Sequence, residues 1–114
     1  MSLDPSNAGA HGGLAHTLYS SGQFEAAREH VTAALRLDDR RLDAWVTRAM
    51  LAALDGDVAV MQEAFQRALA LDAGNYAVYL EMGNALAQLS LHDHAAQAYG
   101  AAYKLAPDNP LVHI

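Results

Sequence analysis

Histidine and carboxylate side chains can ligate metals and act as acid–base catalysts. His92, Asp93 and His94 stand together at the start of a predicted helix. Side chains two positions apart on a helix point about 200° apart, so these two imidazoles share a face only if the turn unwinds. His11 and His16 have no third ligand near them in the sequence. The spacing therefore favours solvated side chains over a metal site, and we expect no cofactor.

Catalysis needs a nucleophile, a positioned base and a group that stabilises developing charge, and the chain shows no such combination. It contains no cysteine, which excludes a thiol nucleophile, a disulfide and a thiolate metal site. Gly12 and Gly13 lie within a helical pattern rather than in a loop that could hold a phosphate. We therefore expect the protein not to be an enzyme.

A pattern of large apolar and small residues recurs every 34 residues. Its clearest copy runs through residues 76–109 and ends at Pro107, which stops a helix. A fixed period of this length indicates an array of repeats. The marks of the three copies, in chain order, are Leu14, Ala15, Leu18, Ala27, Val31 and Ala34; Trp45, Ala49, Ala52, Met61, Phe65 and Ala68; and Tyr79, Met82, Gly83, Leu86, Ala95, Tyr99 and Ala102.

This register resembles the tetratricopeptide repeat family, whose pattern places W-x2-L-G-x2-Y, A-x3-F and P within 34 residues. The resemblance covers three copies, at residues 8–41, 42–75 and 76–109, in one domain. Residues 1–7 resemble the end of a preceding repeat, and residues 110–114 resemble the start of a further repeat or a cap. The resemblance implies an all-α fold, a right-handed α-solenoid of three antiparallel helical hairpins.

Three positions depart from the family pattern. His11 takes the first repeat's aromatic position, and Ser90 replaces the turn glycine that stands at Gly22 and Gly56. Arg48 takes the second repeat's leucine position, where an unpaired buried charge would cost several kcal/mol. We expect Arg48 to reach solvent or to pair with a carboxylate such as Asp55 or Glu81, and an anion site is the alternative.

Periodicity and turn residues predict helices at residues 8–20, 24–37, 42–54, 58–71, 76–89 and 92–105. Asp57 is placed to cap the fourth helix. Glycines 9, 12 and 13 predict fraying of the first helix, since each costs up to about 1 kcal/mol relative to alanine. The large residues Trp45, Phe65, Tyr79 and Tyr99 are expected to bury most of the apolar area of the hairpins.

In stacked hairpins the first helix of each pair lines the inner, concave face. An exposed apolar patch marks a contact surface, and a methionine there adapts to varied ligands. The expectation is therefore a groove for a peptide segment; burial by curvature of the stack is the alternative. The residues predicted on this face are His16, Tyr19, Asp43, Val46, Met50, Ala53, Leu54, Leu80, Asn84, Ala87 and Gln88.

These observations favour a non-catalytic protein–protein interaction module that acts as an adaptor, scaffold or chaperone. One branch of the family holds acidic carboxyl-terminal peptides, but Glu81 would repel a carboxylate and only Asn84 agrees with that branch. The apolar groove is more similar to small bacterial secretion-type chaperones. The alternative is a self-assembling unit, since the outer side of the last helix has no cover, or a regulatory segment of a larger protein or secretion assembly.

Composition excludes several other partners. The net charge is −6 and the basic residues form no stripe, which disfavours nucleic acid. The longest apolar run, Ala49 to Leu54, is too short to span a membrane. The first residues lack the pattern of a secretory signal, so we expect a cytoplasmic protein. The many alanines and arginines beside the single lysine, Lys104, suggest a bacterial source.

Overall fold

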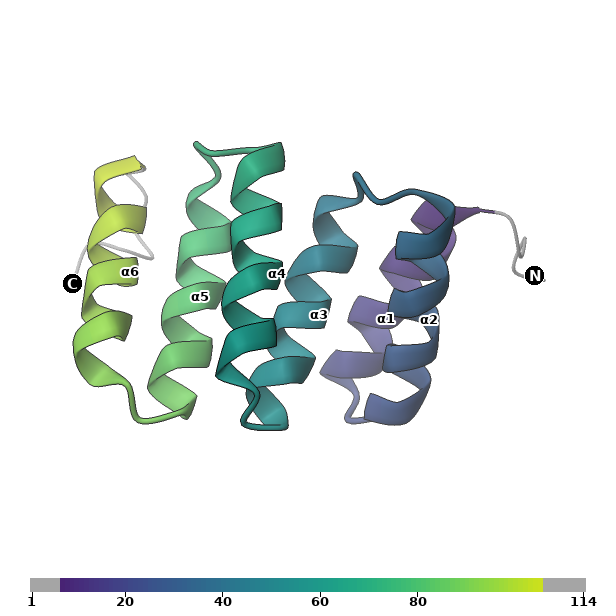
Figure 1. Ribbon diagram of the computed structural model, residues 1–114, viewed down its shortest axis with the longest axis horizontal. Helices are drawn as coiled ribbons and strands as arrows, with labels where there is room; N and C mark the ends of the chain where they lie inside the picture. The colour runs from purple at the N-terminus through teal and green to yellow at the C-terminus, as the bar shows by residue number, and fades with distance from the viewer. Residues whose placement is uncertain (1–6, 106–114) are drawn as a thin grey trace.

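The computed structural model describes residues 7–105, and these form six α-helices joined by short turns (Figure 1). The bounds agree with those predicted, except that the fifth helix ends one residue earlier than residue 89. The expected segments at residues 1–6 and 110–114 lie outside the described part of the chain. The helices are α1 (Ala8–Ser20), α2 (Phe24–Leu37), α3 (Leu42–Leu54), α4 (Val58–Leu71), α5 (Tyr76–Gln88) and α6 (His92–Leu105).

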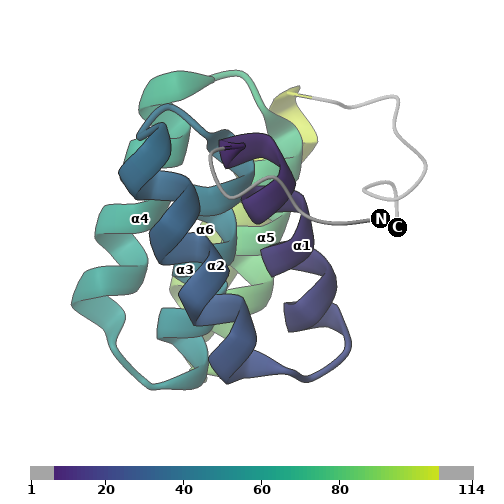
Figure 2. The same ribbon diagram turned by 90° about the vertical axis from the view of Figure 1, so that its right-hand side faces the viewer.

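Consecutive helices pair as antiparallel hairpins, α1 with α2, α3 with α4 and α5 with α6. The first helices of the hairpins also pack on one another, α1 on α3 and α3 on α5. Figure 2 looks along this stack and shows α4 on the side opposite to α1 and α5. The molecule is elongated, 42 × 28 × 24 Å. The predicted all-α fold of stacked hairpins is confirmed.

Polar side chains cap three of the helices where the sequence allows. Asp57 accepts a hydrogen bond from the backbone N–H of Val60, as predicted for the start of α4. The Asn75 side chain does the same at the start of α5. Asn7 caps α1, which is continuous from Ala8 across its three glycines. Each cap satisfies donors that the first turn of a helix leaves unpaired.

The core is narrow because small residues stand at the helix contacts, as the sequence predicts. Gly83 is buried, and a Cβ there would lie 2.7 Å from the Tyr99 ring. Phe65 is 1% exposed, whereas Tyr99 is 37% exposed. The expectation that Tyr99 is a major buried residue is therefore wrong, because no described helix covers α6 on its outer side. The buried small residues are Ala15, Ala27, Ala34, Ala49, Ala68, Gly83, Ala95 and Ala102.

The first hairpin is joined by a pair of histidines. His11 is 7% exposed, and its Nδ1 lies 2.8 Å from Nδ1 of His30 with the two rings stacked. His11 thus occupies the aromatic position of its repeat as a ring that also hydrogen-bonds across α1 and α2. His30 is half-buried in this contact.

Candidate functional site

The concave face holds a cavity of about 170 Å³ that is built by α1, α3 and α5. His16 of α1 and Asp43 and Val46 of α3 were predicted on this face, and the structure brings them together. Helical periodicity explains why these three residues lie together, because each is on the side of its helix that faces away from the second helix of its hairpin. The lining is His16, Leu42, Asp43, Val46, Asn75, Ala77, Val78 and Glu81.

Asp43 is held in place from both sides. Its carboxylate accepts hydrogen bonds from Arg41, at 3.2 Å from Nε and 2.9 Å from Nη2. On the α1 side, a Cβ on Gly12 would lie 2.8 Å from Oδ1 of Asp43, so a larger residue at this position would displace the carboxylate. The hydrogen bond with Asp43 and its negative charge raise the pKa of Arg41. The Asp43 charge is therefore largely matched by its own neighbour.

Glu81 supplies the second negative charge of this face. No ion pair involves Glu81 within residues 7–105. Its charge reaches Tyr19 of α1, whose pKa is raised, first by burial and then by Glu81. Burial disfavours the charged phenolate, and the negative charge of Glu81 disfavours it further. The concave face is therefore apolar with an unmatched acidic edge.

The other predicted groove residues do not all reach this cavity. Ala53 is buried in the core, 3% exposed, so its place on the binding surface is corrected: the α3–α5 contact covers it. Met50 and Leu80 are half-buried, while Asn84 and Gln88 are exposed. Asn84 accepts a hydrogen bond from the Tyr99 hydroxyl. Tyr19, Leu54 and Ala87 are half-buried and pack against the core clusters.

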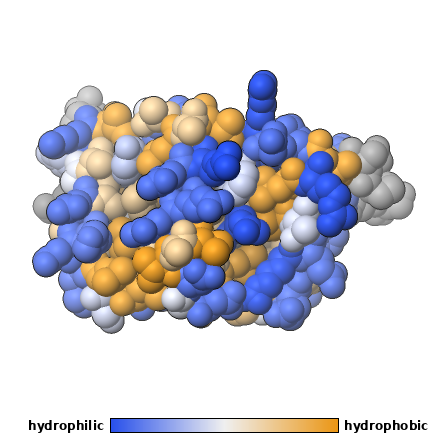
Figure 3. Space-filling model, viewed as in Figure 1, coloured by the Kyte–Doolittle hydropathy of each residue, from blue (hydrophilic) through white to orange (hydrophobic). Residues whose placement is uncertain are grey.

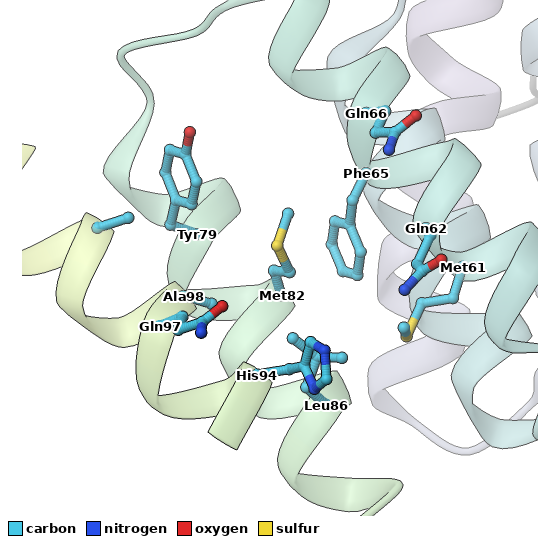
Figure 4. Close-up of a pocket in the computed structure, with 11 residues that line it drawn as sticks. Met61, Gln62, Phe65, Gln66, Tyr79, Met82, Leu86, His94, Gln97 and Ala98 are labelled. Carbon is cyan, nitrogen blue, oxygen red and sulfur yellow. The ribbon is translucent and has the colours of Figure 1, made fainter. Parts of the chain in front are cut away.

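A larger cavity, about 350 Å³, lies on the opposite face between α4, α5 and α6. Figure 4 shows Phe65 reaching from α4 towards Met82 of α5, with Gln97 and His94 on the α6 side. The sequence pattern marked Phe65 and Met82 as packing residues and missed the cavity. The sequence feature that could have predicted this cavity is Met82, an apolar residue where the second repeat has Arg48. The lining is Met61, Gln62, Phe65, Gln66, Tyr79, Met82, Leu86, His94, Gln97, Ala98 and Ala101.

Arg48 is half-buried at the matching place between the first two hairpins, where it lines a cavity of about 290 Å³. Asp55, one of its expected partners, pairs instead with Arg28, at 2.7 Å. No ion pair of Arg48 occurs in the described part of the chain. Arg48 therefore remains partly in solvent, in line with the first of the two expectations.

No group of three histidine, cysteine, aspartate or glutamate side chains within residues 7–105 is arranged to hold a metal ion. No helix in the same range has the length and apolar character needed to cross a membrane.

Known proteins share this architecture. No curated protein matches the chain in sequence. The first TPR of Spaghetti (RPAP3) bound to the HSP90 peptide SRMEEVD superposes with a TM-score of 0.77 at 20% identity, covering 96% of this chain and 87% of that one. Pseudomonas aeruginosa pilF gives a TM-score of 0.77 at 24% identity, covering 92% of this chain. This chain spans about half of pilF, 48%.

At these identities the two structures show a shared fold and nothing finer. The sequence itself is matched by a family model, the tetratricopeptide repeat, at residues 13–60 and 62–110. Those two regions together take in most of the chain and contain the recurring pattern of small and large residues. The chain therefore belongs to the tetratricopeptide repeat family.

Proposed function

We propose that the protein is a non-catalytic interaction module, an adaptor or chaperone, that binds a peptide segment of a protein partner on its concave face. The observation that supports this is the cavity that α1, α3 and α5 build together. No single hairpin contains it, so the stack itself creates the site. Its size suits one or two apolar side chains, with Val46 and Val78 as the apolar walls.

The charges of the face define which peptides it accepts. Asp43 is matched by Arg41, but Glu81 has no cation beside it in the described residues. An acidic peptide would bring like charges together, which costs affinity and slows association. The segment is therefore neutral or basic, in contrast to the acidic peptide SRMEEVD that the Spaghetti domain holds.

The test starts from a displayed library of random peptides, from which the tightest binder is synthesised and titrated by calorimetry. Val46→Glu places a charge in the apolar wall and is expected to weaken binding at least about ten-fold, as is Met50→Glu combined with Leu80→Glu. Ala59→Glu, at an exposed position of α4, is the matched control and keeps full affinity. Equal affinity of Val46→Glu and Ala59→Glu for the peptide would overturn the proposal.

A second candidate is self-association through α6. Tyr103 and Leu105 on this helix are 43% and 45% exposed, and α5 is the one described helix that packs extensively on α6. Exposed large apolar side chains gathered on one element favour a contact with another protein. We expect a dimer by light scattering at high concentration and a monomer for Leu105→Glu. A wild-type protein that stays monomeric at about 1 mM would remove this candidate.

A further inference from the structure

The two junctions between hairpins carry equivalent grooves on the face opposite to the concave one. The first groove lies between α2 and α4 over α3, and the second lies between α4 and α6 over α5. Because the repeat is 34 residues long, six residues of the first groove have a counterpart that lines the second groove. The pairs that line both grooves are Arg28 and Gln62, Val31 and Phe65, Thr32 and Gln66, Arg48 and Met82, Ala52 and Leu86, and Val60 and His94.

The first groove is lined by charged side chains that bind one another. Arg28 of α2 reaches across to Asp55 in the α3–α4 turn, at 2.7 Å, and also pairs with Glu25 at 3.0 Å. Arg48 and Asp57 add further charge to the lining. An apolar ligand would have to break or desolvate these groups, which costs more than its burial returns.

The second groove has the same backbone setting and no acidic, lysine or arginine side chain in its lining. Gln62 stands in place of Arg28, and Leu89 in place of Asp55, so the ion pair that spans the first groove has no counterpart. The floor and walls are Met61, Phe65 and Met82. Figure 3 shows apolar surface at its lower left, where α4, α5 and α6 lie in Figure 1.

We propose that this second groove is a docking site, separate from the concave face, for an uncharged peptide segment that inserts an aromatic side chain. Thioether sulfurs make favourable contacts with aromatic rings, and the half-buried Met82 lines the cavity beside the buried side chains of Phe65 and Met61. Its volume of about 350 Å³ falls within the range of specific ligand sites.

Three exposed glutamines at the edge of the second groove explain why the occupant is a peptide. Gln62, Gln66 and Gln97 line the cavity and are exposed, and a glutamine amide both donates and accepts hydrogen bonds. Such groups match the alternating N–H and C=O of a peptide backbone. With no acidic, lysine or arginine side chain in the lining, a charged segment finds little to pair with there and loses hydration on entry.

NMR of the methionine methyl groups tests the proposed docking site, because different methionines lie on the two faces of the molecule. The four methionines include Met61 and Met82 in the groove and Met50 on the concave side. The probe is the capped peptide acetyl-Ser-Gln-Leu-Phe-Gln-Ser-amide, with two variants in which alanine replaces phenylalanine or glutamate replaces both serines. We expect saturable shifts of the Met61 and Met82 methyls while Met50 stays in place. The alanine peptide should bind at least about ten-fold more weakly, and the glutamate peptide several-fold more weakly.

Variants of the protein test the groove independently of the peptide variants. Met82→Arg and Gln62→Arg each install the residue that the first groove carries at that position, so the fold already tolerates it there. Each variant should weaken the affinity for the peptide by about ten-fold or more, as followed by the shift of the Met61 methyl. The matched control, Ala59→Arg, adds the same charge at an exposed α4 position outside the lining and leaves binding unchanged.

Several results would overturn the proposal. Shifts at Met50 alone would assign the peptide to the concave face and leave that proposed function standing without this one. Equal binding of the phenylalanine and alanine peptides, or no saturable shift up to about 5 mM peptide, would exclude an aromatic anchor. Shifts of Met61 and Met82 that follow protein concentration without peptide would make a second copy of the chain the occupant. Gln62→Arg keeps the test valid if Met82→Arg does not fold, because Gln62 is exposed.

Discussion

Ser90 adopts a backbone conformation that glycine occupies in the two other hairpins. Its φ is 62°, against 83° for Gly22 and 74° for Gly56. A side chain in this left-handed region costs roughly 1 to 2 kcal/mol, because Cβ crowds the following carbonyl. The tight turn from α5 to α6 imposes the angle regardless of which residue is present.

Replacing Ser90 with glycine is therefore expected to stabilise the protein. The relief of strain exceeds the extra freedom that glycine has in the unfolded chain, so we expect a gain of about 0.5 to 1 kcal/mol in the free energy of unfolding. Urea denaturation measures it. Gly22→Ser is the reverse change and should lose a similar amount; a loss for Ser90→Gly would contradict the argument.

Tyr19 reports on the acidic edge of the concave face. Its pKa is raised above 10.0, first by burial and then by Glu81. Glu81→Gln is expected to lower the pKa of Tyr19 while leaving it above 10.0, because burial is the larger cause. An NMR titration of the Tyr19 ring carbon measures this. Asp43→Asn is the control and should leave the pKa of Tyr19 unchanged, since Asp43 is not among the causes of the shift.

The same shift sets how stability depends on alkaline pH. A folded-state pKa above the unfolded value means that the neutral phenol is favoured in the folded protein. The contribution of Tyr19 is therefore fully present below pH 10.0 and is lost as pH rises through the folded-state pKa. In urea titrations above pH 10.0, Tyr19→Phe should lose stability less steeply than wild type, and an equal slope would contradict the assignment.

The pairing of α5 with α6 depends on the absence of a side chain at Gly83. A Cβ there would lie 2.7 Å from the Tyr99 ring, closer than atoms pack. The matching pairs in the other hairpins are Ala15 with Val31 and Ala49 with Phe65, and all four of these residues are buried. In the third hairpin, the larger Tyr99 ring is thus accommodated by the smaller Gly83 opposite it.

Gly83→Ala is expected to destabilise the protein by about 1 kcal/mol. Overpacking costs roughly 1 to 3 kcal/mol, which outweighs the gain of about 1 kcal/mol in helix propensity. In a Tyr99→Val background, which copies the first hairpin, the ring is absent and the same change should stabilise by up to about 1 kcal/mol. A double-mutant cycle by urea denaturation measures the reversal of sign. The same sign in both backgrounds would show that Tyr99 does not limit the contact.

Across the whole molecule, the two junctions are unequal. α5 packs less extensively on α3 and α4 than α3 packs on α1 and α2. The second junction also lacks the ion pair that Arg28 and Asp55 make across the first. In a stacked array, stability is a sum of hairpin terms and junction terms, so a weaker junction lets its outer hairpin open on its own.

We therefore expect the α5–α6 hairpin to open before α3–α4 does. Native-state hydrogen exchange should show lower opening free energies for amides of α5 and α6, by about 1 to 2 kcal/mol, with α3 and α4 the most protected. Gln62→Arg combined with Leu89→Asp copies the ion pair into the second junction and allows a comparison. Uniform protection across all helices of the described chain would contradict unequal junctions.

The sequence by itself determined the repeat, the fold class and nearly all helix bounds. Local signals suffice for these, because the 3.6-residue period, the turn glycines and caps such as Asp57 act within a few residues. The repeated register then predicted which small residues meet at the helix contacts, for example Ala49 and Ala95. It also predicted the concave position of His16, Asp43 and Val46, since one helix face follows from one period.

Only the tertiary structure decided how much of each face stays open. Ala53 has the same periodic position as a groove residue, but packing of α5 on α3 buries it. Tyr99 has the position of a core aromatic, but its outer side is uncovered. The cavity around Met82 exists because the spacing between two hairpins exceeds what their side chains fill. Such spacing depends on the fit of many side chains at once, which no local pattern in the sequence records.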